Sequence, residues 1–136
     1  MRIVGRPLTA AIGAAALVVG VGVGLVSGQG EWKAPAEAKG TKNPQSGPAS
    51  VVAGKKAADT NCVTCNGPAG KGDGPAAAAL TPKPADWTSA KVKAEADGEL
   101  FWKISNGRGP MPPWKHLPEK ERWDLVNYVR SVQGKK

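Results

Sequence analysis

Two cysteines carry the most distinctive chemistry of the chain. Cys62 and Cys65 are separated by two residues and are followed directly by Asn66. A Cys-x-x-Cys pair followed by histidine attaches c-type haem, in which both thiols bind the porphyrin and the imidazole coordinates the iron. Asn66 occupies the place of that histidine, and its amide is neutral and not basic. The spacing therefore predicts covalent haem at Cys62 and Cys65, with Asn66 at the proximal position of the iron, where it cannot act as histidine does.

The cysteine pair also has two other interpretations. Without haem, in an oxidising compartment, the two thiols would form a small disulfide or remain a dithiol. As ligands of another metal they are too few, because tetrahedral zinc takes four donors and the chain has a single histidine, His116. The residues alone leave haem attachment and a haem-free pair open.

Length and charge limit the range of functions. At 136 residues, the chain has room for one domain of about ninety residues and a targeting or anchoring segment. A domain of this size buries little surface, so a covalent haem would supply much of its core. The net charge of +8 suits acidic redox partners or anionic lipid headgroups. The lysines are scattered without a basic run or recognition motif, which argues against nucleic acid and is also typical of an ordinary solvated surface.

The N-terminus has the features of an export segment. Arg2 and Arg6 precede an almost wholly apolar run over residues 8–26. The run, at about 19 residues, exceeds a usual signal-peptide core and approaches the length that spans a bilayer. We therefore expect residues 1–28 to be a cleaved signal peptide or an anchor in the inner membrane, with the remaining chain in a bacterial periplasm.

The rest of the chain divides into an arm and a helical domain. Residues 29–49 are rich in Pro, Gly, Ala and Lys without an apolar period, which is typical of a linker or extended arm. Residues 50–134 contain helical patterns. Ser50 is expected to cap a helix that runs towards Cys62, and Gly54 within that helix needs a packing reason, because it costs about 1 kcal/mol against Ala.

Two more helices and two loops complete the domain. Apolar spacing predicts a helix that begins at Asp97 or Gly98 and ends near Gly107, and a last helix over residues 119–133. Residues 67–74 form a glycine-rich loop that lacks the Gly-Lys-Ser/Thr of a phosphate-binding loop. Residues 82–87 are rich in proline and are expected to be extended. Because no alternating strand pattern appears, the predicted fold class is all-α.

These segments resemble the class I, mono-haem cytochrome c family over about residues 50–133. The motifs that carry the resemblance are Cys-x-x-Cys-x-Gly, Gly-x-Gly-Asp-Gly, Leu-x-Pro-x-Pro-Ala-Asp, Asn-Gly-Arg-Gly-x-Met-Pro-x-Trp and the terminal Glu-Arg-Trp-x-Leu-Val-Asn-Tyr-Val. The chain departs from the family at Asn66 and at Ala57-Ala58, where members usually carry a bulky pair. The segment around Trp32 resembles an arm that precedes some small periplasmic cytochromes c, which implies that Trp32 packs on the domain.

The resemblance implies the residues of a haem site. One haem c would be held covalently by the two cysteines, and Met111 would be the distal iron ligand. An isolated methionine is ordinarily core filler, but Met111 is framed by prolines rather than placed on an apolar stripe. A proline carbonyl of the extended wall would accept a hydrogen bond from the residue at position 66. Three further residues would pack against the haem: Pro82, Trp102 and Trp114.

The implied function is single-electron transfer between respiratory-chain redox proteins, with no enzymatic activity, because no carboxylate pair or Ser-His-Asp set is visible. Two alternatives follow from Asn66. One is a haem-free binding or structural module with a cytochrome-like fold. The other is a haem protein with an open coordination position that binds small ligands. His116 lies five residues beyond Met111, so it would reach only the distal side, and it is otherwise an exposed loop residue.

Overall fold

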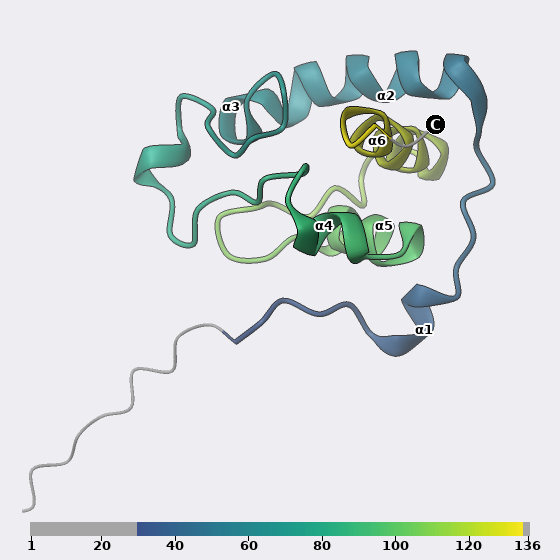
Figure 1. Ribbon diagram of the computed structural model, residues 1–136, viewed down its shortest axis with the longest axis horizontal. Coiled ribbons are helices and arrows are strands. Elements are labelled where there is room, and N and C mark those ends of the chain that lie inside the picture. Colours follow the sequence, from purple (N-terminus) through teal and green to yellow (C-terminus); the bar gives the residue numbers. More distant parts are fainter. Residues whose placement is uncertain (1–29, 135–136) are drawn as a thin grey trace, which may run out of the picture. The chain divides into compact units, whose positions relative to one another are not determined.

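Three helices form the framework of the domain in this computed structural model, which describes residues 30–134 (Figure 1). They are α2 (Gly47–Asn61), α5 (Asp97–Asn106) and α6 (Glu119–Val132). Shorter helices lie between them or in the arm: α1 (Ala36–Lys39), α3 (Val63–Asn66), the 3-10 helix η1 (Ala77–Ala79) and α4 (Ala90–Ala94). Apart from one isolated bridge between Arg108 and Met111, residues 30–134 contain no β-structure, so the all-α prediction is confirmed.

The N-terminal predictions fall on residues that are not described. The expected signal peptide or anchor, residues 1–28, lies outside the described residues. Within residues 30–134, none of the helices has the length and apolar character needed to cross a membrane. The chain from Glu31 onward forms one compact unit, which includes the arm together with the helical domain. The predicted division between arm and domain at residue 49 stays a prediction.

Helices α2 and α6 cross closely at Gly54. A Cβ atom at this position would overlap the carbonyl oxygen of Asp124 in α6 and would crowd the backbone of Leu125. Any side chain here would therefore push the two helices apart. This is the packing reason that the mid-helix glycine required, and it fixes α6 against the middle of α2. Figure 1 shows α6 lying between α2 and α5.

A buried polar network holds the same crossing. The Ser50 hydroxyl donates to Oδ1 of Asp124 at 2.5 Å, and Asp124 is only 2% exposed. Nδ2 of Asn127 donates to the Ser50 hydroxyl at 2.7 Å, while Lys120 pairs with the other carboxylate oxygen of Asp124 at 2.7 Å. A buried carboxylate needs such partners, because an unpaired one would lose its hydration without compensation.

The predicted cap at Ser50 is wrong. Helix α2 begins earlier, at Gly47, with Ser46 at the N-cap and Pro48 in its first turn. Proline favours the first turn of a helix because its missing N–H would have no partner there. Ser50 therefore lies inside the helix, and its hydroxyl binds Asp124 instead of the helix backbone. The bounds predicted for α5 and α6 agree with the structure to within one residue.

Two hydrophobic clusters lie on the two sides of α6. One contains Val92, Leu100, Trp123, Val126 and Val129. Phe101 adds to this cluster by stacking on Trp123, with ring centroids 3.9 Å apart. The second contains Ala57, Ala58, Leu125 and Tyr128. The aromatic ring beside the two alanines is therefore that of Tyr128 in α6, whose hydroxyl donates to the carbonyl of Pro68 at 3.2 Å.

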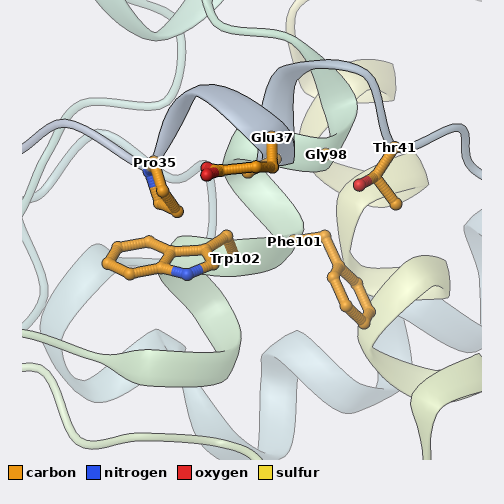
Figure 2. A pocket seen from close by; sticks show the side chains of 7 residues that line it. Pro35, Glu37, Thr41, Gly98, Phe101 and Trp102 are labelled. Carbon is orange, nitrogen blue, oxygen red and sulfur yellow. The ribbon is translucent and has the colours of Figure 1, made fainter.

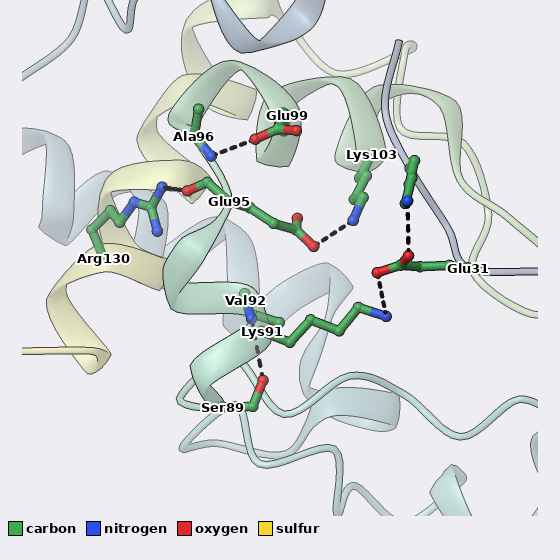
Figure 3. A network of polar contacts seen from close by, with 10 residues as sticks. Glu31, Ser89, Lys91, Val92, Glu95, Ala96, Glu99, Lys103 and Arg130 are labelled. Carbon is green, nitrogen blue, oxygen red and sulfur yellow. Dashed lines mark hydrogen bonds and ion pairs between the residues drawn. The ribbon is translucent and has the colours of Figure 1, made fainter. Parts of the chain in front are cut away.

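The arm packs on α5, as expected from Trp32. Nζ of Lys103 lies 5.2 Å from the centre of the Trp32 ring and pairs with Glu95 at 2.5 Å (Figure 3). Glu31 pairs with Lys91 at 3.5 Å, which attaches the start of the arm to α4. Farther along, Nδ2 of Asn43 donates to Asn127 in α6 at 2.9 Å. The arm is therefore attached at several points and is not a free linker.

Replacement of Gly54 by alanine tests the crossing. Gly→Ala inside a helix ordinarily stabilises a protein by about 1 kcal/mol. Here the added methyl would overlap the Asp124 backbone, so Gly54→Ala should lower the free energy of unfolding by about 1–3 kcal/mol, measured by urea denaturation. The matched control is Gly40→Ala, where the nearest atom to the new Cβ lies 3.7 Å away and the change should stay within about 0.5 kcal/mol. A stabilised Gly54→Ala variant would contradict this description of the crossing.

Candidate functional site

One helical turn carries both cysteines and Asn66. Cys62 caps α2, with its N–H bonded to the carbonyl of Ala58 at 2.8 Å, and it also begins α3. The N–H groups of Cys65 and Asn66 donate to the Cys62 carbonyl at 3.1 and 2.8 Å. Both thiols are free and half-buried. The backbone therefore presents the two sulfurs and the Asn66 side chain from one short, hydrogen-bonded segment.

The two cysteines differ in their surroundings. Cys62 packs against the second hydrophobic cluster, at the end of α2. This burial, with a smaller contribution from the nearby Cys65, raises the pKa of the Cys62 thiol to about 11. Because the thiolate is the reactive form, Cys62 is a neutral and slowly reacting thiol near neutral pH.

The glycine-rich loop, residues 67–74, is hydrogen-bonded to this turn. N–H groups of the loop donate to the carbonyls of Asn66 (Gly72, 2.9 Å) and Cys65 (Gly74, 3.0 Å). Gly70 has φ +68°, and a Cβ there would overlap the ring of Trp87. The loop thus lies between the cysteine turn and the residues of the extended wall, and it needs glycine for its close contacts.

Asn66 binds the extended wall. Its amide Nδ2 donates to the carbonyl oxygen of Ala85 at 3.3 Å. The expectation that a wall carbonyl accepts a bond from residue 66 is confirmed, but the expected acceptor, a proline, is wrong. The Pro84 carbonyl instead faces Gly72, whose added Cβ would overlap it. Pro82 is exposed, and its packing against haem stays a prediction.

The loop that contains Met111 is a tight, backbone-bonded turn. The N–H of Arg108 donates to the Met111 carbonyl at 2.9 Å, and the N–H of Met111 donates back to Arg108 at 3.1 Å. Gly107, with φ +62°, leaves no room for a side chain beside the Met111 carbonyl. The N–H of Trp114 donates to the carbonyl of Ile104 at 3.1 Å, which attaches the loop to α5. Met111 is half-buried in this turn, and its role as an iron ligand stays a prediction.

The remaining predicted residues lie in different surroundings. Trp102 lines a pocket beside Pro35 and Glu37 of the arm, and its contact with haem stays a prediction. The half-buried Trp114 lies beside the exposed ring of His116, with ring centroids 5.4 Å apart. Among the described residues, no three His, Cys, Asp or Glu side chains form a group that would hold a metal ion.

The residues fit a covalent haem in most respects. Two thiols come from one turn, and apolar side chains that are only partly covered pack against the same cluster as Cys62. Among them are Ile104, Leu117 and Trp87, whose remaining exposed surface is suited to an apolar, planar group. The misfit is at position 66, because an amide that donates to Ala85 supplies no basic nitrogen to iron. The site therefore has attachment points and an apolar wall but lacks the usual proximal ligand.

Sequence reasoning missed two of these residues. Ala85 was not identified as the acceptor, because the choice among neighbouring carbonyls depends on how the wall meets the glycine loop. Leu117 was missed because it lies in an irregular loop, where no period marks an inward-facing residue. Its only signal was an apolar residue between His116 and Pro118.

Comparisons with known proteins agree with this geometry. The family model of cytochrome c matches residues 51–133, which is more than half of the chain. No curated protein sequence matches the chain. Among solved structures, the chain is similar to one from the reducing HAO-like protein complex of Kuenenia stuttgartiensis, with 30% identity and a TM-score of 0.59. The match covers 67% of this chain and 47% of that chain, so it spans less than half of the other protein's length.

The pKa of Cys62 predicts a specific alkylation profile. In a haem-free Cys65→Ser variant, the rate of Cys62 alkylation should be low at pH 8 and should rise about tenfold per pH unit until the pH nears 11. The raised pKa places the thiolate at high pH, so no plateau is expected at pH 10, where a thiol of ordinary pKa would already level off. Mass spectrometry of iodoacetamide-treated samples measures the rates. A plateau by about pH 10 would show that burial does not act on this thiol.

A histidine at position 66 tests the missing ligand. We expect Asn66→His to raise the haem content of protein matured with its haem-attachment machinery, and to give a low-spin absorption spectrum if Met111 is the distal ligand. Asn61→His is the matched control, because it adds a histidine to the end of α2 on the other side of the cysteines and should leave the spectrum as it was. A high-spin spectrum of Asn66→His would rule out Met111 as a ligand.

Proposed function

Because the chain belongs to the cytochrome c family, we propose that it carries single electrons between respiratory-chain redox proteins through a covalently bound haem c. The observation that supports this most directly is the free Cys62 and Cys65 pair, presented by one turn inside the segment that matches the family. A haem iron supplies reversible one-electron chemistry when it is bound. No other group in the described residues offers redox chemistry of that kind.

The chain's own residues would hold the group and exclude water. Cys62 and Cys65 provide two thioether attachments at the end of α2. Met111 would supply a thioether, a soft donor that favours reduced iron. Ile104 and Leu117 would cover apolar surface next to Cys62 and limit access of solvent. No catalytic side chains are needed for this function, and we propose that the protein is not an enzyme.

Surface charge is suited to acidic partners. The chain has a net charge of +8, and basic side chains such as Lys56 and Lys83 are exposed. Long-range attraction of this kind speeds the encounter with acidic redox proteins and weakens as ionic strength rises. The similar solved structure is part of a protein complex, which agrees with a partner protein as donor or acceptor. We place the domain in the periplasm because the apolar run at residues 8–26 is typical of an export segment.

A second candidate function rests on Asn66. Because its amide is bound to Ala85 and is not basic, residue 66 would supply the iron with no strong donor, and Met111 is the donor proposed for the other side. A haem held in this way would bind small ligands such as carbon monoxide at the open position. Carbon monoxide that shifts the reduced spectrum of the native protein, and no longer shifts that of Asn66→His, would favour this function over electron transfer alone.

Electron exchange tests the proposed function. Protein matured with haem-attachment machinery should be reduced by ascorbate and reoxidised by ferricyanide over repeated cycles, followed by its visible absorption. Transfer to an acidic redox protein should slow as salt is raised. The Cys62→Ser/Cys65→Ser double variant should show no such absorption change. A haem-loaded native protein that cannot be cycled would contradict electron transfer.

A further inference from the structure

A pocket lies between the arm and α5, apart from the cysteine turn. It has a volume of about 460 Å³, within the size range of small-molecule sites. We call it the α1–α5 pocket, and its lining residues are Pro35, Glu37, Ala38, Thr41, Gly98, Phe101 and Trp102. Figure 2 shows Pro35 and the Glu37 carboxylate on the α1 side and the indole of Trp102 on the α5 side.

The pocket combines an aromatic wall with an unpaired negative charge. The Glu37 side chain is exposed, and its carboxylate makes no ion pair or hydrogen bond with another described residue. Trp102 is half-buried, and its indole forms part of the wall of the pocket. An indole face attracts cations through its quadrupole, and a carboxylate at the same site adds direct attraction. The combination therefore favours a positively charged ligand with apolar substituents.

The neighbouring aromatic rings already bind cations of this domain. Lys103 lies over the Trp32 ring at 5.2 Å and pairs with Glu95 at 2.5 Å. The guanidinium of Arg122 lies 4.7 Å from the centre of the Phe101 ring. Trp102 is the ring in this group that has no cation over it among residues 30–134. The α1–α5 pocket likewise combines an indole, that of Trp102, with a glutamate, Glu37.

The lysines nearest in sequence do not supply that cation. Lys33 pairs with Glu31 at 3.1 Å, and Lys103 pairs with Glu95. Lys39 is two residues from Glu37 on the same short helix, a spacing at which side chains do not face each other. The Glu37 carboxylate is therefore open to a cation from outside the chain.

We propose that the α1–α5 pocket binds a small alkylammonium ion, with its charge next to the Glu37 carboxylate and its alkyl groups against Trp102 and Pro35. The hydroxyl of Thr41 adds a hydrogen-bonding group for a polar substituent on the ligand. The volume has room for the alkyl groups of a free organic cation, which would cover more of the apolar lining than the ammonium group of a partner's lysine. None of the residues that line this pocket belongs to the cysteine turn.

Choline is the probe that we would use first. At low salt, choline chloride added to the folded protein should shift the indole N–H signal of Trp102 in an NMR spectrum, with saturation in the millimolar range. The Trp102→Phe variant identifies this signal by its loss. Glu37→Gln should weaken choline binding about threefold, because it removes an exposed charge and preserves the shape. The matched control is Glu121→Gln on α6, an equally unpaired glutamate outside the pocket, which should leave binding unchanged.

Three results would overturn the proposal. The first is a Trp102 shift that stays linear up to about 100 mM choline, which would mean contact without a site. The second is equal weakening by Glu37→Gln and Glu121→Gln, since binding would then follow total charge. The third is binding of a lysine-containing peptide, or of phosphatidylcholine vesicles, without binding of free choline, because the surface would then recognise a protein or a membrane.

Discussion

The close crossing of α2 and α6 is the constraint on which the rest of the domain depends. Gly54 brings the two backbones together, and the buried Ser50–Asp124–Asn127 network prevents the helices from sliding. Because Cys62 ends α2, this crossing also sets where the cysteine turn meets the cluster around Tyr128. The position of the two cysteines therefore depends on the packing of α2 against α6 two turns earlier in α2.

Backbone hydrogen bonds assemble the site from separate parts of the chain. The cysteine turn is bonded to the glycine-rich loop, that loop contacts the extended wall, and the Met111 turn is bonded to the end of α5. These contacts do not depend on the side chain of residue 66. The domain consequently retains the shape of a cytochrome c although Asn66 replaces the usual histidine, and its amide is held by Ala85.

Sequence reasoning succeeded where local signals decide structure and failed where tertiary contacts do. The apolar spacing and the residues at the helix ends predicted α5 and α6. Because a glycine inside a helix is costly, the sequence also indicated that Gly54 has a packing role. Ser50 was misplaced because a serine that caps a helix and one that binds a distant carboxylate look alike in sequence. The short helices α1 and α4 were not predicted, since segments of four or five residues carry too few apolar positions to show a period.

We expect this cytochrome c domain to carry covalent haem in spite of Asn66. The most direct test is the intact mass of the native protein, produced with haem-attachment machinery, together with its reduced absorption spectrum. We expect a mass increase of one haem and a c-type absorption band, both absent from a variant in which Cys62 and Cys65 are serine. An unmodified mass without a visible band would contradict it and would leave a haem-free module with a cytochrome-like fold.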